Sequence, residues 1–252
     1  MGAPLDNLHV PWKNDARMGA YETLLRPILF LLPPERAQAS AEWLFRQSWL
    51  WRAASPLLDY HDPRLHVRTA GLEFPSPVGL AAGYDKSCEF LESLLALGFG
   101  YVVGGTVVPQ PRAGNPSPRL MRLPRQGSLI NALGFPSKGM EAAQKNLDLL
   151  RRKARLRSKP ILVSVAGLSL EEFLACHATL EPLADATEMN ISSPNTQGLR
   201  VFQEPETFKR LLERINAQRS KPLFVKIPPF GDDGGREKVL GLVRIAREMG
   251  VD

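Results

Sequence analysis

The stretch Ala-Thr-Glu-Met-Asn-Ile-Ser-Ser-Pro-Asn-Thr, residues 186–196, joins a strand-like run to a polar turn. Asn190 and Ser192 share one face of the predicted strand, because successive side chains of a strand alternate between its two faces. The chain then turns at Pro194. Turns of this composition are usually structural, but this one is dense in uncharged donors and acceptors that suit a polar heterocycle such as a pyrimidine.

The same pattern, an apolar run followed by polar residues, recurs along the chain. Strand-like runs lie at residues 78–82, 101–106, 161–166, 186–191 and 223–227, after a predicted β-hairpin at 65–68 and 72–74. Helical patterns lie between and after these runs, at residues 88–97, 138–152, 171–183, 205–219 and 236–249. Strand and helix therefore alternate five times, which predicts a parallel sheet in a single α/β domain.

Two α/β architectures contain such a sheet. A closed (β/α)8 TIM barrel needs eight strands, whereas a doubly wound sheet can be complete with five. Polar residues follow the strands at Asp85, Lys86, Thr106, residues 190–196 and Lys226. In barrels this carboxyl-terminal rim carries the chemistry, and the long excursion over residues 107–137 is typical of functional rim material. We therefore expect an incomplete TIM barrel with about five of its eight strands present.

The first 60 residues differ in composition from the rest. They hold six Lys/Arg and six Asp/Glu, so the basic excess belongs to residues 61–252, and they hold all four tryptophans. An apolar segment at residues 24–32 ends at Pro33 and Pro34, and a second helix is predicted from about Glu35, with Ala37, Ala41, Leu44, Phe45 and Ser48 on one face. We expect two domains, an N-terminal helical hairpin over residues 1–60 and a partial barrel over residues 61–252.

The hairpin has two interpretations. As an ordinary cap it would pack its apolar face on the main domain. As a membrane element it would rest part of that face in a lipid interface, where an indole keeps its ring in the apolar layer and its N–H in the polar one. The residues alone favour the cap.

Composition narrows the function classes. The net charge of +6 and the pI near 9.5 permit nucleic acid, anionic lipid or an anionic small molecule as ligand. No cluster of Lys and Arg interleaved with aromatics supports nucleic acid. The two cysteines, Cys88 and Cys176, support neither a disulfide framework nor a metal site, which indicates a reducing, intracellular compartment. Since no run of about 18 apolar residues occurs, we expect no membrane span.

Two lysines lie at positions where a bound anion would pair with their charge. In Ala-Ala-Gly-Tyr-Asp-Lys, residues 81–86, small residues would let a flat ligand approach the backbone, and Lys86 could reach an anion there. Lys226 points the way Phe224 points, so it faces the predicted interior, where burial costs several kcal/mol unless an anion pairs with it. That anion is either a reduced flavin, whose charge collects near N1 and O2, or an Asp or Glu on a neighbouring strand.

Several blocks together resemble the dihydroorotate dehydrogenase family in order and spacing. They are AAGYDK at 81–86, GTVVPQPRAGNPSPRLMRL at 105–123, INALGF at 130–135, NISSPNTQGLR at 190–200 and VKI at 225–227. The resemblance runs from about Ala20 to the end of the chain. It implies a (β/α)8 barrel with FMN across its mouth, which oxidises dihydroorotate to orotate in pyrimidine biosynthesis. The hydride would pass to FMN and the electrons to a quinone.

The resemblance also implies roles for individual residues. Ser193 would take the C5 proton of the substrate while hydride leaves C6. Substrate contacts would come from Lys86, Asn131, Ala132, Leu133, Gly134, Phe135, Asn190 and Asn195. Cofactor contacts would come from Ala82, Gly83, Tyr84, Asp85, Lys86, Thr106, Asn190 and Lys226, and no metal is implied.

The quinone-linked class is similar in its serine at the base position and in its N-terminal hairpin. The hairpin then becomes a quinone entrance, and this reverses the preference for a cap. The protein would lie peripherally at the cytoplasmic face of a bacterial inner membrane, with a quinone as its partner.

Three departures from the family pattern affect the expected site. Val165 stands where the family commonly has an asparagine that contacts FMN, and Ala132 and Pro136 replace residues of the orotate pocket. The strands expected to hold the FMN phosphate are absent, so we expect a fragment or an inactive relative. The competing hypotheses are another FMN barrel, such as a dihydrouridine synthase, and a non-catalytic relative that only binds a pyrimidine or a membrane.

Overall fold

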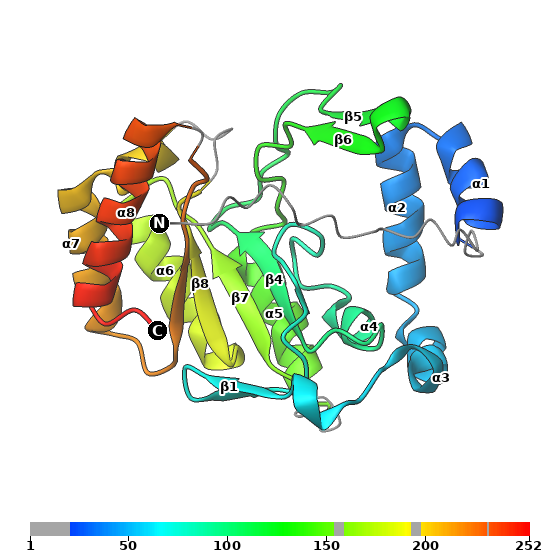
Figure 1. The fold of residues 1–252 in the computed structure, drawn as a ribbon, viewed down its shortest axis with the longest axis horizontal. Coiled ribbons are helices and arrows are strands. Elements are labelled where there is room, and N and C mark those ends of the chain that lie inside the picture. Colours follow the sequence, from blue (N-terminus) through cyan, green and yellow to red (C-terminus); the bar gives the residue numbers. More distant parts are fainter. Residues whose placement is uncertain (1–20, 154–158, 193–197, 231) are drawn as a thin grey trace, which may run out of the picture. The chain divides into compact units, whose positions relative to one another are not determined.

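The computed structural model describes residues 21–153, 159–192, 198–230 and 232–252. Contacts between Cα atoms divide the chain into two compact units, Met1–Ala41 and Glu42–Asp252. The second unit holds the sheet and most of the helices (Figure 1). Residues 42–60 therefore belong to the same unit as the sheet.

The described part of the first unit is helical, as the sequence predicts. A π-helical turn at Tyr21–Leu25 leads into α1 (Arg26–Leu31), and α2 (Pro34–Phe45) begins at the proline pair and crosses into the second unit. A proline is tolerated in the first helical turn, because the N–H that it lacks would have no partner there. The predicted helix thus ends at Phe45 rather than at Ser48, where a separate helix begins. Among the described residues, no helix combines the length and the apolar character that a bilayer crossing requires.

The second unit is built on a parallel sheet of five strands. The strands are β3 (Gly79–Leu80), β4 (Tyr101–Val107), β7 (Ile161–Val165), β8 (Ala186–Asn190) and β9 (Leu223–Lys226), in the order β3-β4-β7-β8-β9. Every neighbouring pair is parallel. The five predicted strands are confirmed in type and order, and the sheet is curled into part of a barrel (Figure 1).

Helices follow the strands as predicted. They are α4 (Leu91–Leu95), α5 (Met140–Arg151), α6 (Leu170–Leu180), α7 (Pro205–Asn216) and α8 (Asp233–Glu248). Side-chain caps fix two starts: Ser169 accepts from Glu172 N–H at 3.2 Å, and Asp232 accepts from Gly235 N–H at 2.6 Å. Short 3-10 turns occur at Pro63–Leu65, Pro124–Gln126, Glu181–Leu183 and Leu199–Gln203.

Three elements complete the second unit. The predicted β-hairpin is present as β1 (Val67–Thr69) and β2 (Leu72–Phe74). Sequence analysis missed the helix α3 (Ser48–Leu58) and a second hairpin, β5 (Leu120–Leu123) and β6 (Ser128–Asn131), within the long excursion. Neither element has a buried apolar stripe, and Pro56 lies inside α3, so the periodicity on which helix and strand prediction rests is weak there.

Each face of the sheet has its own apolar cluster. The larger cluster joins the sheet to the helices and includes Val163, Met189 and Phe208. The smaller cluster lies on the concave face and joins Phe74 of β2 to Val103, Leu162 and Ala186. Since these strand residues come early in their strands, the amino-terminal end of the concave face is filled. The carboxyl ends of the strands remain available for polar groups.

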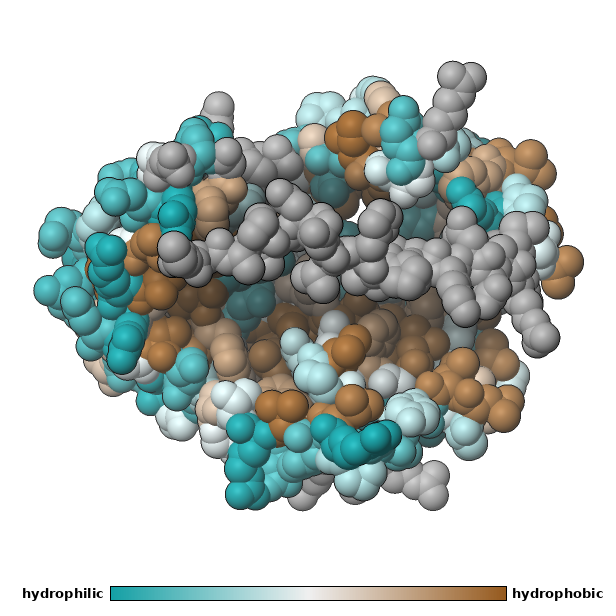
Figure 2. All heavy atoms as spheres, viewed as in Figure 1, coloured by the Kyte–Doolittle hydropathy of each residue, from teal (hydrophilic) through white to brown (hydrophobic). Residues whose placement is uncertain are grey.

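Two carboxylates attach residues 42–60 to the sheet unit. Glu89 lies between Arg46, at 2.6 Å, and Lys138. Glu92 lies between Arg52, at 3.5 Å, and Lys153, at 2.6 Å. Each carboxylate therefore bridges a cation from the 42–60 segment to a cation near one end of α5. The opposite face of α3 is apolar: Figure 2 shows brown residues gathered there, where Leu50, Leu57 and Leu58 are exposed.

Replacing Glu92 with Gln should loosen α3, because Arg52 and Lys153 would lose their shared counter-charge. Hydrogen bonds to charged groups contribute about 1.5–3 kcal/mol, and we expect the lower end because both cations are half exposed. Urea unfolding measures the loss of stability, and limited proteolysis within residues 48–58 measures the loosening.

The matched control is Asp148→Asn, which removes the exposed i,i+4 pair with Arg152 and should cost less than about 0.5 kcal/mol. Equal costs for the two substitutions would show that Glu92 does not act as a bridge.

Candidate functional site

A buried polar network lies at the carboxyl ends of β4, β7 and β8. Asn190 Nδ2 donates to Thr106 Oγ1 at 2.8 Å, and Thr106 Oγ1 lies 3.0 Å from Ser164 Oγ. Asn190 Oδ1 accepts from both the backbone N–H and the hydroxyl of Ser192, at 3.0 and 2.8 Å. The structure thus brings together Thr106 and Asn190, two of the residues predicted to contact the cofactor. They come from positions 84 residues apart in sequence.

The segment that follows β3 lies beside this network. Gly83 N–H donates to Gly105 O, and Gly105 N–H donates to Asp85 O, each at 2.8 Å. Gly83 has a φ of +118°, and a Cβ built on it would meet no atom within 4 Å. A flat ligand therefore has room to approach the backbone here, as the small residues of this segment predict.

Two predicted residues of this segment use their side chains inside the protein. The Asp85 carboxylate accepts from Glu89 N–H and Phe90 N–H, at 2.8 and 2.7 Å, and so holds the start of the α4 region. Burial raises the pKa of Asp85 to about 6, although these hydrogen bonds act against the rise. The Tyr84 ring packs edge-on against Phe45 and Phe90. A ligand contact from either residue would have to come from its backbone.

Lys86, which follows the Gly83 segment, has a second cation, Arg119, near it. Burial lowers the pKa of Lys86, and the charge of Arg119 lowers it further, while Glu42 and Asp85 act in the opposite direction. Arg119 is itself fixed by the carbonyl groups of Ala113, at 2.5 Å, and Asn115, at 3.1 Å. Two positive groups near one another favour binding of a small anion such as a carboxylate.

The predicted substrate segment, residues 131–135, is folded against the preceding part of its loop. Asn115 donates from Nδ2 to Ala132 O at 2.8 Å and from its backbone to Leu133 O at 2.9 Å. Gly134 has a φ of +70° and lies so close to the Asn115 side chain that a Cβ would clash at 2.5 Å. Phe135 also has a positive φ, of 53°. Asn131 and Ala132 are exposed, and Leu133 and Phe135 are half-buried.

The loop returns to the Lys86 segment at its far end. Lys138 N–H donates to Ser87 Oγ at 3.3 Å, and the Lys138 ammonium contacts Glu89. The end of the loop is thus tied to residues that closely follow Lys86. Ser193 and Asn195, predicted as the base and as a substrate contact, lie outside the described residues.

On the concave face, the half-buried Glu188 precedes Asn190 by two residues. Glu188 pairs in register with Ser164 of β7 and Phe224 of β9, and Asn190 pairs with Lys226. Because these partners share a face, Lys226 points with Phe224, as predicted, and Glu188 is a carboxylate on the neighbouring strand. Lys226 acts on Glu188 through its charge, but no carboxylate of the described residues lies within 4.0 Å of Lys226 Nζ. Lys226 therefore has a carboxylate on the neighbouring strand, as one of the two predictions for it requires. Its ammonium also remains available to a bound anion, as the other prediction requires.

The position of Val165 corrects the alignment made from sequence. Val165 is completely buried in the cluster that joins the sheet to the helices, so it does not face the concave side. Its neighbour Ser164 does face that side and contacts Thr106. A polar residue at position 165 would therefore point away from the candidate cofactor site.

Sequence analysis missed Ser164, Glu188 and Arg119 as members of the site. The signal for Glu188 was its spacing of two from Asn190, which places both on one strand face. Ser164 is likewise two residues from Leu162 on one strand face. Because the residues on both faces of this strand are buried, no alternation of polar and apolar residues marked that face. Arg119 lies in a loop whose course no periodicity predicts.

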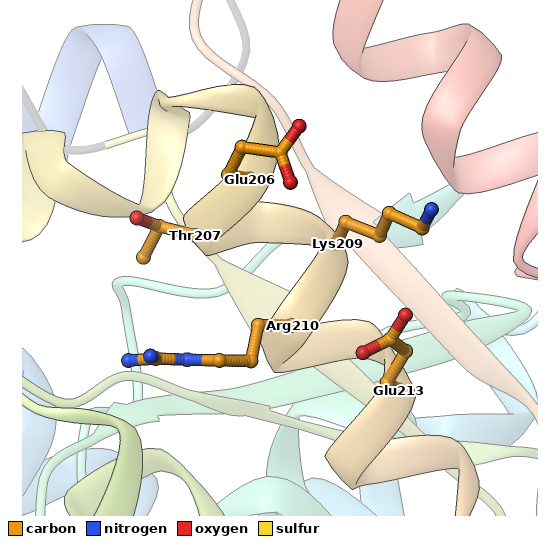
Figure 3. Close-up of a pocket in the computed structure, with 5 residues that line it drawn as sticks. All are labelled: Glu206, Thr207, Lys209, Arg210 and Glu213. Carbon is orange, nitrogen blue, oxygen red and sulfur yellow. The ribbon is translucent and has the colours of Figure 1, made fainter.

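A second hollow lies on the outer surface of α7. Figure 3 shows the five residues that line this hollow of about 410 Å³, namely Glu206, Thr207, Lys209, Arg210 and Glu213. Charges of both signs at helical spacing are typical of a solvated helix face. Among the described residues, no group of three or more His, Cys, Asp or Glu is arranged to hold a metal ion.

Comparisons with known proteins agree with this geometry. The family model for dihydroorotate dehydrogenase matches residues 64–240. The chain is 38% identical to the dihydroorotate dehydrogenase (quinone) of Thermus thermophilus, over 88% of this chain and 67% of that protein. It is 44% identical to the dihydroorotate dehydrogenase (quinone) of Anaeromyxobacter dehalogenans, over 81% of this chain and 59% of that protein.

A solved structure is also similar. The crystal structure of Eimeria tenella DHODH in complex with ferulenol superposes with a TM-score of 0.74 at 29% identity, over 87% of this chain and 65% of that chain. The chain thus spans 59% to 67% of the length of these three relatives.

The orientation of Val165 predicts that Val165→Asn destabilises the protein without strengthening flavin binding. An amide buried among the helices without a partner costs about 1–3 kcal/mol. Val165→Thr, nearly isosteric but with one buried hydroxyl, should rank between the parent and the Asn variant. Urea unfolding gives the order of stability, and FMN titration followed by flavin fluorescence gives the affinity. Tighter FMN binding by the Asn variant would mean that position 165 faces the cofactor after all.

Proposed function

Because the chain belongs to the dihydroorotate dehydrogenase family, we propose that it forms the FMN and substrate site of an enzyme that oxidises dihydroorotate to orotate in pyrimidine biosynthesis. The observation that carries the proposal is the polar network of Thr106, Ser164 and Asn190 beside open space at Gly83. It supplies fixed donors and acceptors next to a backbone that a flat ring can approach. A dihydrouridine synthase is not supported, since the family is dihydroorotate dehydrogenase.

The residues of this site fit a flavin. A Cβ on Gly83 would meet nothing within 4 Å, so the ring has space, and in the described ranges no carboxylate lies within 4.0 Å of Lys226 Nζ to compete for it. FMN, when bound, would supply the acceptor for the substrate hydride. Asn190, Thr106 and Lys226 would orient its ring, and the backbone of residues 82–86 would lie along its edge.

The substrate would be held by charge and by the long loop. Lys86 and Arg119 would bind the orotate carboxylate, because both are cationic groups and lie near one another. The segment from Asn131 to Phe135 would cover the ring. Hydrogen bonds from Asn115 hold its backbone in one conformation. Asn190 and Asn195 would bind the polar edge of the ring. Ser193 would accept the C5 proton as general base.

The N-terminal segment, residues 1–60, would receive the quinone at the membrane surface. Its support is the number of exposed apolar residues on its helices. Leu24, Ile28 and Leu31 are 66%, 62% and 85% exposed, and Trp43, Trp49 and Leu57 are 64%, 64% and 90% exposed. Apolar and indole groups of this kind suit a peripheral position in a lipid interface. We propose a peripheral position at the cytoplasmic face of a bacterial inner membrane, and the exposed apolar residues support its peripheral character.

The proposal is tested on a version extended to the length of the relatives. That protein should be yellow, with the absorbance of bound flavin, and dihydroorotate should bleach it without oxygen. A colourless protein that binds orotate would instead be a non-catalytic pyrimidine-binding relative.

Ser193→Ala in this extended version should keep FMN and orotate binding but reduce flavin slowly, since the proton on C5 would lose its acceptor. General bases typically contribute on the order of 10²–10⁴-fold to a rate, so the loss should be large. Anaerobic stopped-flow spectroscopy with dihydroorotate measures it. Ser220→Ala, at the end of a surface turn, is the control. A near-normal rate in the Ser193 variant would remove Ser193 from the mechanism.

Deleting residues 1–41 should spare flavin reduction by dihydroorotate but lower reoxidation by a long-chain quinone in vesicles. This deletion removes the first compact unit and leaves the bridges through Glu89 and Glu92 in place. A water-soluble quinone is the control acceptor and should still be reduced. Unchanged turnover with the long-chain quinone would contradict a role for this unit in quinone entry.

A further inference from the structure

Glu188 is half-buried on the concave face, in register with Ser164 of β7 and two residues before Asn190. Its Oε1 atom has no hydrogen-bond partner in the described structure and is closed off from solvent. Burial raises the pKa of Glu188, while hydrogen bonding by the Ser164 hydroxyl and the charge of Lys226 act against the rise. The proposed catalytic steps do not use this group. Removing a carboxylate oxygen from water without a partner is a net cost to folding.

The polar network has a definite direction that ends at this carboxylate. Ser192 N–H donates to Asn190 Oδ1, which fixes the orientation of the amide, so Asn190 Nδ2 must be the donor to Thr106. Thr106 accepts this bond with Oγ1, and its own hydrogen is free to donate to Ser164, 3.0 Å away. Ser164 is the register neighbour of Glu188 on β7, so its hydroxyl can turn to donate to that carboxylate. With Glu188 ionised, every hydroxyl in the chain points toward the negative charge.

Protonation of Glu188 would reverse part of this chain. The carboxylic acid would donate to Ser164, and Ser164 would donate to Thr106 Oγ1, which can accept two hydrogen bonds. The Thr106 hydrogen would then have no internal acceptor and would be available to a ligand. One proton on Glu188 therefore changes what Thr106 offers at the site, from acceptor to donor.

Few charged groups lie near Glu188. From β7 it faces the neutral Ser164, and from β9 it faces Phe224 and the cationic Lys226. The apolar cluster below it consists of Phe74, Val103, Leu162 and Ala186. Lys226 is the charged group that stabilises the ionised form among the described residues. An anion that bound beside Lys226 would cancel that stabilisation and would also repel Glu188 directly.

We propose that Glu188 is a proton-linked positioning residue, which takes up a proton from solvent when an anion binds beside Lys226 and thereby turns the Thr106 hydroxyl into a donor toward the ligand. This rests on the proposed function for the nature of the anion, which would be the ring of reduced FMN. The coupling of Glu188 to Lys226 and Ser164 does not depend on it. Because the complex holds one more proton than the free protein, affinity for the anion rises as pH falls.

The coupling is tested first without any ligand. Carboxyl-¹³C glutamate is incorporated into the 252-residue chain, and the glutamate resonances are followed from pH 3 to pH 9 in about ten steps. Lys226→Met mimics the neutralising effect of an anion, and it should move one glutamate titration to higher pH. Ser164→Ala should move the same resonance in the same direction, because it removes the hydrogen bond that lowers the pKa. Glu188→Gln should delete that resonance.

Controls keep the result independent of general destabilisation. Lys209→Met and Glu213→Gln change exposed charges on α7 and should leave the shifted resonance unmoved. The assignment does not require Glu188→Gln to fold, because the Lys226 and Ser164 variants must displace one common resonance. If they displace different resonances, or none, the proposed coupling is wrong.

The ligand step is then tested by calorimetry with oxidised and chemically reduced FMN in two buffers of different ionisation enthalpy. Reduced FMN should bind with uptake of up to about one proton, and its affinity should rise as pH falls. The Glu188→Gln variant, whose amide mimics the protonated acid, should take up none and should bind with little pH dependence. Uptake by that variant equal to the parent's would overturn the ligand step. If neither form of FMN binds this chain, the cofactor assignment fails for it, and the carboxyl titration still decides the coupling.

Discussion

The hydrogen bond from Asn190 to Thr106 is the interaction on which the site depends. It joins β8 to β4 across the intervening β7, and it recruits Ser164 of that strand through the Thr106 hydroxyl. A bond of this kind is worth little in water but is costly to leave unmade once its groups are buried. The three strand ends are therefore held at one spacing, and the Gly83 backbone lies beside them through Gly105.

The two faces of the sheet divide structural and functional work. The outer face is apolar and fixed by helices, and Val165 belongs to it although the sequence pattern suggested a cofactor contact. The concave face is apolar only at its amino-terminal end, where Phe74 of the hairpin fills it. Beyond that end, Ser164, Glu188, Asn190 and Lys226 form a polar floor. Alternate side chains of one strand thus face either the packed core or the polar concave side.

The segment from Glu42 to about residue 60 has one apolar side and one charged side. Its apolar surface on α3 is exposed, while its charged side is held to the rest of the sheet unit through Glu89 and Glu92. A carboxylate shared by two cations keeps the helix oriented without covering its apolar residues. The polar attachment therefore leaves the apolar face available.

The sequence by itself determined the strands, their order and several residues of the candidate site. Five apolar runs became the five strands because a strand buried on both faces needs a continuous apolar stretch. Thr106, Asn190 and Lys226 were identified because polar residues at strand ends are conspicuous. Elements without such a signal were missed, as with α3, which lacks buried residues, and the β5–β6 hairpin, whose strand β6 is exposed and whose strand β5 has no buried residue.

Only the tertiary structure decided which face each residue occupies and which neighbours it meets there. Val165 and Ser164 are adjacent in sequence, and register against β8 alone assigns one to the core and the other to the site. The same register sets Glu188 beside Ser164, and Lys226 beside Asn190, so that a half-buried carboxylate adjoins the network. Pairing between strands acts over tens of residues, so no local pattern contains it.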